Sequence, residues 1–258
     1  MATGIDHLVI AVPDPDAAAA ELSASLGLAF TAGGRHAGAG TYNRVAFVGD
    51  AYLELIGVDD RRLAEGNAIG AAAVRALDAG GGLATYALVD DELEATVASL
   101  RANGSSIGPA ERGTRQRPDG GEVAWWRAGF PRLGPDDPPF LIRHDPSGAE
   151  WGPDERAERA AFVHPIGSPA VLVRLDIATP DPPSLAATYR RELGLELWSV
   201  ADLAVATVGR HTIRLVPERE MPVPAAAVIG AEVPDARTHE ALGMRFDIEP
   251  VGIRLPAG

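Results

Sequence analysis

The distribution of apolar positions over the N-terminal region predicts one βαβββ module. Residues 5–12 form an almost continuous apolar run, which is typical of a buried strand. A turn rich in proline and aspartate leads into the alanine-rich segment 17–26, which is expected to be a helix that ends at Gly27. Two β-type runs, 42–48 and 51–58, follow with Gly-Asp between them, as in a hairpin.

The same pattern returns near the C-terminus. The segment Ile-Ala-Val-Pro-Asp-Pro at 10–15 becomes Ile-Ala-Thr-Pro-Asp-Pro at 177–182, and the Leu-Gly-Leu that ends the helix returns at 193–195 with the same offset. After this point the offset falls by seven, because the glycine-rich loop 34–40 has no counterpart in the later copy. The two copies therefore share a fold, and the loop belongs to the first copy alone.

A second, weaker copy lies between these two regions. The pattern predicts a strand at 83–89, a helix at 90–103 with apolar positions on one face, and strands at 122–130 and 140–144. A strand-like run at 244–255 follows the last copy. The sequence therefore predicts an α+β fold of three βαβββ modules, with boundaries 1–65, 80–150 and, for a degenerate third module with a C-terminal strand, 168–258.

Charge and composition narrow the range of partners. The chain of 258 residues has 36 acidic and 23 basic side chains and a net charge of −13. An acidic surface repels phosphate backbones and anionic lipids, so we expect no nucleic-acid partner and no membrane partner. No apolar run approaches the roughly 18 residues of a membrane span.

Residue types that are absent exclude several chemistries. The chain has no cysteine, which removes disulfides and thiolate chemistry and agrees with a cytoplasmic location. The first predicted strand begins so close to Met1 that we expect no signal peptide. Every basic residue is arginine, so a lysine Schiff base is excluded. No phosphate-binding loop or dinucleotide fingerprint is present, so no nucleotide cofactor is expected.

The motifs of the first module carry a family resemblance. They are Ile-Asp-His-Leu-Val-Ile-Ala-Val at 5–12, Gly-Arg-His at 34–36, Tyr-Leu-Glu-Leu-Ile at 52–56 and, further on, Pro-Phe-Leu-Ile at 139–142. This pattern resembles the vicinal oxygen chelate superfamily, which includes glyoxalase I, bleomycin-resistance proteins and extradiol dioxygenases, and most of all its glyoxalase-like domain proteins. The resemblance implies that modules one and two pair, and that their mixed sheets curl around a cup. The third module would then be a packing or dimerisation partner, which allows a homodimer.

The resemblance also implies metal ligands on the first and fourth strand of each module. In module one these are His7 and Glu54, which suit Zn, Ni, Mn or Fe, whereas the last copy has Arg174 and Arg214. A carboxylate inside Tyr-Leu-Glu-Leu-Ile is costly to bury unless it is paired or bound to a metal.

Module two departs from this pattern. The positions that correspond to the two ligands fall at Thr85 and near Arg143. Alternation places His144 on the face opposite Arg143. Two alternatives to a metal site stay open, a buried hydrogen bond between His7 and Glu54 and an ion pair between Glu54 and Arg143.

Other polar side chains are candidates for contact with a ligand. Arginine and histidine at the tip of the glycine-rich loop are placed to meet an anionic or carbonyl group, and alternation directs two residues of the following strand inward. Of the two consecutive tryptophans at 125–126, one must face the cup. The candidate substrate-binding residues are Arg35, His36, Thr41, Asn43, Trp125 and Arg143.

These observations lead to one functional prediction and its alternative. We expect a lyase or isomerase that depends on a divalent metal and acts on a small molecule with vicinal oxygens, with Glu54 as a metal ligand and catalytic base. The alternative is a metal-free cup that sequesters a ligand, as bleomycin-resistance proteins do, and the missing ligands of module two favour it. A purely structural interaction module would leave the loop 34–40 and Glu54 without a purpose.

Overall fold

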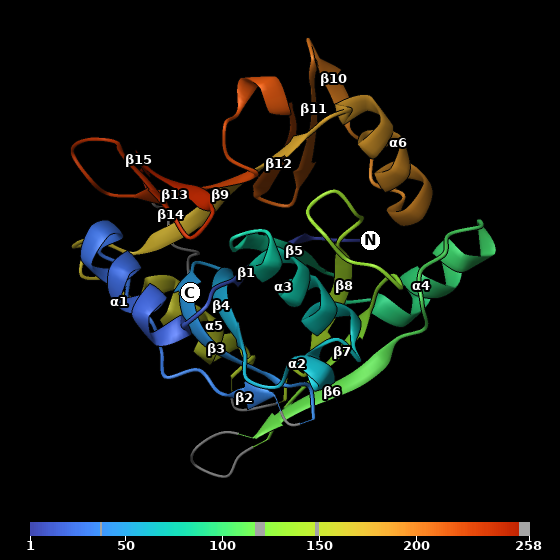
Figure 1. Ribbon diagram of the computed structural model, residues 1–258, viewed down its shortest axis with the longest axis horizontal. Coiled ribbons are helices and arrows are strands. Elements are labelled where there is room, and N and C mark those ends of the chain that lie inside the picture. Colours follow the sequence, from blue (N-terminus) through green and yellow to red (C-terminus); the bar gives the residue numbers. More distant parts are fainter. Residues whose placement is uncertain (37, 117–121, 148–149, 253–258) are drawn as a thin grey trace.

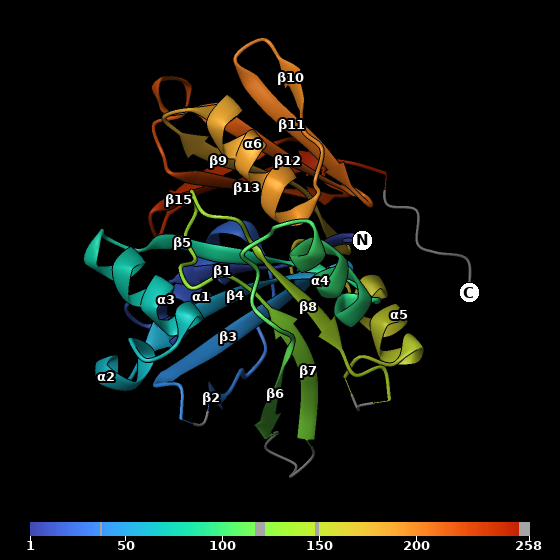
Figure 2. The ribbon, with the colours of Figure 1, turned by 90° about the vertical axis from the view of Figure 1, so that its right-hand side faces the viewer.

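The computed structural model describes residues 1–36, 38–116, 122–147 and 150–252. Two mixed β-sheets lie one above the other, and the helices lie against them (Figure 1, Figure 2). The predicted α+β class with curled mixed sheets is confirmed. The helices are α1 (Pro15–Leu26), α2 (Arg61–Ala64), α3 (Ala68–Asp78), α4 (Leu93–Ala102), α5 (Pro153–Ala161) and α6 (Pro182–Leu193).

The first sheet is built from the first two predicted modules. Its strand order is β2-β3-β4-β1-β5-β8-β7-β6. The prediction missed β6 in module two. The strands are β1 (Gly4–Ala11), β2 (Arg35–His36), β3 (Thr41–Val48), β4 (Ala51–Val58), β5 (Gly82–Val89), β6 (Glu111–Gln116), β7 (Glu122–Ala128) and β8 (Phe140–His144).

The two halves of this sheet are related by an approximate twofold axis. β1 and β5 are antiparallel neighbours at the centre, and each has a parallel partner on its other side, β4 and β8 respectively. Figure 2 shows β3 and β7 on either side of the sheet, which curls between them. Side chains from both halves therefore converge on one concave face.

A β-bulge recurs at the centre of both sheets. In β1 the pairing with β5 passes from Ile5 directly to His7, so Asp6 is the extra residue. The corresponding extra residue in β5 is Ala84, and in β9, the first strand of the second sheet, it is Val173. Among these three bulges, only the one in β1 carries a titratable side chain.

The second sheet contains the third predicted module and three further strands. Its order is β10-β11-β12-β9-β13-β15-β14. The tail was expected to hold one strand, but the structure has three. The strands are β9 (Ala170–Thr179), β10 (Trp198–Val200), β11 (Leu203–Val208), β12 (His211–Pro217), β13 (Ala225–Ala231), β14 (Arg237–Ala241) and β15 (Met244–Pro250).

The sequence repeat corresponds to matching helix caps. Asp14 accepts hydrogen bonds from the first backbone N–H groups of α1, and Asp181 does the same for α6. Gly27 and Gly194 end these helices in the left-handed conformation, with φ of 71° and 64°. The repeated Pro-Asp-Pro and Leu-Gly-Leu segments are thus the start and stop signals of equivalent helices.

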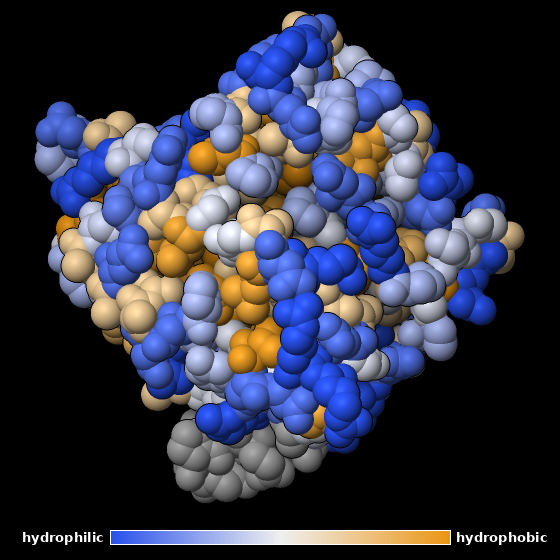
Figure 3. Space-filling view, in the orientation of Figure 1, coloured by the Kyte–Doolittle hydropathy of each residue, from blue (hydrophilic) through white to orange (hydrophobic). Residues whose placement is uncertain are grey.

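Buried contacts join the two sheets into one molecule. A single hydrophobic cluster includes residues of both sheets. The buried hydroxyls of Tyr86 and Tyr189 are 3.0 Å apart, and the backbone N–H of Ile5 donates to Nδ1 of His211 at 2.9 Å. Figure 3 shows a largely hydrophilic surface with separate, small hydrophobic patches on the face toward the viewer. In the described part of the chain, we find no helix with the length and apolar character needed to cross a membrane.

Candidate active site

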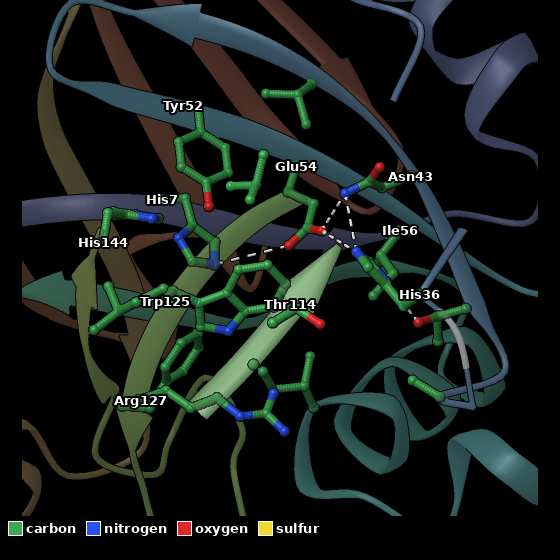
Figure 4. A pocket seen from close by; sticks show the side chains of 18 of the residues that line it. His7, His36, Asn43, Tyr52, Glu54, Ile56, Thr114, Trp125, Arg127 and His144 are labelled. Atoms are coloured by element: carbon green, nitrogen blue, oxygen red, sulfur yellow. Dashed lines mark hydrogen bonds and ion pairs between the residues drawn. The ribbon is translucent and has the colours of Figure 1, made fainter. Parts of the chain in front are cut away.

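A cavity of about 450 Å³ occupies the concave face of the first sheet. Its walls come from both halves of the sheet, and Figure 4 shows the side chains that point into it. Strands β1, β3 and β4 supply His7, Asn43 and Glu54, and β7 supplies Trp125 and Arg127. The cavity therefore contains titratable groups on one side and an indole and a guanidinium on the other.

Glu54 lies on β4 with its carboxylate directed into the cavity. Only 7% of its surface is exposed. Its Oε1 accepts a hydrogen bond of 2.6 Å from Nδ2 of Asn43. Two imidazoles flank it, with Nε2 of His7 3.7 Å from Oε2 and Nε2 of His36 3.6 Å from Oε1. The carboxylate is thus held by an amide and faces two groups that can carry protons.

Arg143 does not take part in this site, which corrects both predictions made for it. Its guanidinium donates to Oε1 of Glu94 on α4 at 2.7 Å and stacks on Trp126, 4.3 Å from the ring centre. Alternation along β8 explains this, because Phe140 and His144 line the cavity and Arg143 points to the opposite face. The expected substrate contact and the Glu54–Arg143 ion pair were therefore wrong.

Asp6 was not recognised from the sequence, yet it holds His7 in place. Its Oδ1 is 2.6 Å from Nδ1 of His7, and its Oδ2 is 2.9 Å from Nε2 of His144. Burial alone would raise the pKa of Asp6, but the charge of His144 and hydrogen bonds from both histidines hold this pKa well below its usual range. An ionised Asp6 can only accept at this contact, so Nδ1 of His7 donates to it and the ring is oriented with Nε2 toward Glu54. Strict alternation would place Asp6 on the other face of β1, and only the bulge brings it beside His7.

His36, Thr41 and Asn43, which were predicted to contact the substrate, lie at the rim and on the wall of the cavity. Nδ1 of His36 is 2.8 Å from Oγ1 of Thr41, and its Nε2 is 3.3 Å from Nδ2 of Asn43. Oδ1 of Asn43 also accepts from the backbone N–H of Gly34 at 2.8 Å. These contacts tie the glycine-rich loop to the group that holds Glu54.

Arg35 lies outside the cavity, contrary to its predicted role in substrate contact. Its side chain is 74% exposed and forms an ion pair with Asp59. Its guanidinium also lies 5.5 Å from the ring centre of Tyr42. Because Arg35 and His36 are consecutive residues of β2, they point to opposite sides, and only His36 points inward.

Trp125 faces the cavity, as expected for one of the two tryptophans. Its indole packs directly over Gly113 of β6, where an added Cβ would lie 2.4 Å from Nε1. Val123, Trp125 and Arg127 share this face of β7, while Trp126 lies under Arg143 on the other face. Arg127 was not among the substrate-binding residues predicted from the sequence.

The residues present do not fit the four-ligand metal site that the resemblance implies. Strand pairing makes Thr85 the counterpart of His7 and Phe140 the counterpart of Glu54, because Ala87 pairs with Phe140 as Val9 pairs with Glu54. Phe140 cannot ligate a metal, and Thr85 does not line the cavity. In the ranges that the structure describes, no three His, Cys, Asp or Glu residues converge as a metal site would require. Metal binding by His7 and Glu54 stays a prediction that rests on two ligands.

Comparison with known families identifies the class of protein. The profile of the glyoxalase-like domain matches residues 5–193, which is more than half of the chain. The chain therefore belongs to the glyoxalase-like domain family, and the resemblance to the vicinal oxygen chelate superfamily is confirmed. No curated protein matches the sequence.

Solved structures share the fold at low sequence identity. A hypothetical protein from Staphylococcus aureus is 14% identical, with a TM-score of 0.79, and the alignment covers 96% of this chain and 99% of that one. Methylmalonyl-CoA epimerase from Mycobacterium tuberculosis is 21% identical with a TM-score of 0.40, covering 57% of this chain and 89% of that one. A 4-hydroxymandelate synthase variant from Streptomyces coelicolor is 14% identical with a TM-score of 0.49, covering 90% and 72%.

Proposed function

We propose that this protein is an isomerase or lyase that moves a proton on a small molecule with vicinal oxygens. The observation that supports this most is the buried carboxylate of Glu54, which faces the cavity between two imidazoles. Among the described residues, no arginine lies within ion-pair distance of it. A buried carboxylate without an arginine partner is suited to accept a proton.

The chemistry assigned to Glu54 is general-base catalysis. Its carboxylate would take the proton from a carbon next to a carbonyl group, and the electron pair of the broken C–H bond would move to the carbonyl oxygen as an enolate. His7, held at Nδ1 by Asp6, presents Nε2 to the same space and stabilises the enolate when protonated. On a substrate with a hydroxyl group on the carbon that lost its proton, transfer of the hydroxyl proton to the enolate oxygen moves the negative charge to the other vicinal oxygen. Return of the proton from Glu54 to the former carbonyl carbon then completes an isomerisation, and no step requires a metal.

The second candidate is a binding protein without catalysis. This candidate is favoured because Thr85 and Phe140 occupy the two positions of module two at which the resemblance implies metal ligands. Aromatic rings of Tyr52, Trp125 and Trp151 line the same cavity and offer apolar surface to a ligand. Under this alternative, Glu54 and His7 would serve only to hydrogen-bond the ligand.

Exchange of carbon-bound hydrogen distinguishes the two candidates. A panel of α-hydroxy ketones and α-keto acids is incubated with the protein in D₂O, and loss of the C–H signal is followed by NMR. We expect the wild type to catalyse exchange on at least one compound, and Glu54→Gln to slow it by about 100-fold or more, because general-base catalysis typically contributes that much. Glu94→Gln is the matched control, since Glu94 lies outside the cavity and pairs with Arg143.

Two outcomes would contradict the proposal. If Glu54→Gln binds the same compounds and exchanges them at the wild-type rate, Glu54 is not the base. The metal content of both proteins is measured in the same preparation. One equivalent of a divalent metal that is lost in Glu54→Gln would show a metal-dependent enzyme, as the family resemblance implies, and would replace the metal-free route.

A further inference from the structure

Arg127 is a cation inside the cavity that the proposed proton transfer does not use. It lies on β7, and Figure 4 shows its side chain pointing into the cavity across from Glu54. Its neighbour on the same face is Trp125, whose indole is held over Gly113. A guanidinium and an aromatic ring therefore form one wall, opposite the titratable wall.

This guanidinium has no partner in the part of the chain that the structure describes. Other arginines of the molecule bind carboxylates, for example Arg61 with Asp78, Arg143 with Glu94 and Arg214 with Asp176. Arg127 makes no such ion pair and no hydrogen bond among the described residues, although its surface is partly buried. A guanidinium removed from water without a partner is costly, so an anion that pairs with it would be bound strongly.

The charges around Arg127 leave it available to a ligand. Glu111 is directly opposite on β6, and Glu54 lies across the cavity, but neither is within ion-pair distance. Burial lowers the pKa of Arg127, and the negative charges of Glu111 and Glu54 oppose that shift. An arginine side chain stays charged at neutral pH in either case.

The cavity continues past Arg127. A second hollow of about 380 Å³ shares four lining residues with the first, namely Asn67, Ile69, Arg127 and Phe140. Arg127 therefore stands where the two hollows meet, away from the proton-transfer groups. A ligand that reaches Glu54 with one end can place its other end beside this guanidinium.

We infer that the cavity binds a carboxylate with an apolar or aromatic body, whose carboxylate pairs with Arg127 and whose body lies against Trp125. The inference rests on the proposed function in one respect: the opposite end of the substrate is the oxygen-bearing carbon that meets Glu54. It adds the substrate class, an organic acid, and it assigns to Arg127 the role of the residue that selects it.

A pair of probes that differ only in charge tests this inference. Binding of 4-phenylbutyrate and of its neutral amide, 4-phenylbutyramide, is measured by isothermal titration calorimetry. We expect the wild type to bind the carboxylate at least tenfold more tightly than the amide. Arg127→Met should abolish this preference without weakening the amide, and Arg127→Lys should keep part of it, since lysine keeps the charge but not the fork of donors. Arg112→Met, an exposed charge on the strand paired with β7, should leave the preference unchanged.

The opposite results would overturn the inference. If wild type does not prefer the carboxylate, or if Arg127→Met and Arg112→Met reduce the preference equally, Arg127 is not the anion site. A failure of the proposed function gives a different result. If the carboxylate preference depends on Arg127 but the wild type catalyses no exchange, the protein is an anion-binding cup without catalysis. If exchange depends on Glu54 but the protein shows no preference for the carboxylate, the proposed catalysis stands and the organic-acid substrate class is wrong.

Discussion

Asp6 is completely buried, and two histidines rather than water keep it ionised. Its carboxylate contacts Nδ1 of His7 and Nε2 of His144. His7 in turn stacks on Tyr52, with ring centres 4.5 Å apart, and His144 stacks on Trp151 at 3.5 Å. The orientation of His7 toward Glu54 therefore depends on Asp6, which does not itself line the cavity.

The pH dependence of stability reports on Asp6. Its pKa in the folded protein lies below the ordinary value of 3.8, so its contribution to the free energy of unfolding is fully present above about pH 4 and is lost as the pH falls toward the folded-state pKa. Asp6→Asn should lower the free energy of unfolding by about 3–5 kcal/mol at pH 7, because it breaks a buried charge pair. The difference should be about 1 kcal/mol smaller at pH 3. Urea unfolding at the two pH values measures this, and an equal difference at both would contradict it.

The bulge and the alternation of each strand decide which side chains meet. Three strands share the bulge, at Asp6, Ala84 and Val173, so it is a property of the fold, and β1 alone uses it to place a carboxylate. In the second sheet, Arg174 and Arg214 occupy the positions of His7 and Glu54, and both bind the buried Asp176. The same strand arrangement thus forms a cavity with a carboxylate that has no arginine partner in one sheet and a buried cluster of ion pairs in the other.

The fit of Trp125 over β6 predicts the effect of one methyl group. In Gly113→Ala the new Cβ would lie 2.4 Å from Nε1 of Trp125, so the indole must move away from its wall. We expect weaker binding of both phenylbutyl probes, a shift of the tryptophan emission and a folded protein. Gly252→Ala, where an added Cβ meets nothing within 4 Å, is the matched control. Unchanged binding and emission in Gly113→Ala would show that the indole is not held by this contact.

At the scale of the whole molecule, the second sheet supports the strand that carries the site. Nδ1 of His211 on β12 accepts the backbone N–H of Ile5, next to the bulge at Asp6. Ser106 donates to Glu192 of α6 at 2.7 Å through its backbone N–H, and Tyr86 on β5 meets Tyr189 on α6. The third module therefore packs within the chain, against both halves of the first sheet.

His211 should couple this packing to pH. Burial lowers its pKa to about 4, while Asp50 and Asp6 raise it by a smaller amount and Arg210 lowers it further. The unfolded chain therefore binds the proton first as the pH falls below 6.5, and stability decreases between about pH 6.5 and 4. From pH 7 to pH 5 this group lowers the free energy of unfolding by at most about 2 kcal/mol. His211→Asn keeps an acceptor but should lose this part of the pH dependence in urea unfolding, and an unchanged slope would contradict the assignment.

The parts of this protein that follow from local sequence were predicted well. The strand at 5–12, the helix start after the Pro-Asp-Pro turn, the helix end at Gly27 and the repeat at 177–182 are signalled by residues close together in the chain. Strand alternation directed Thr41 and Asn43 into the cavity, and the family resemblance directed His7 and Glu54 there. Their physical basis is short-range: backbone conformation, capping and the period of two in a strand.

Tertiary structure alone decided the partners of these residues. The register of β5 with β8 places Phe140 at the position that corresponds to Glu54 and turns Arg143 outward, and the bulge in β1 turns Asp6 toward His7. Register and bulges are set by hydrogen bonds between strands that are far apart in sequence, and a shift of one residue changes the face of every side chain. The sequence by itself therefore determined the modules and the chemical groups of the first strand, and strand pairing determined which of those groups share the cavity with Arg127.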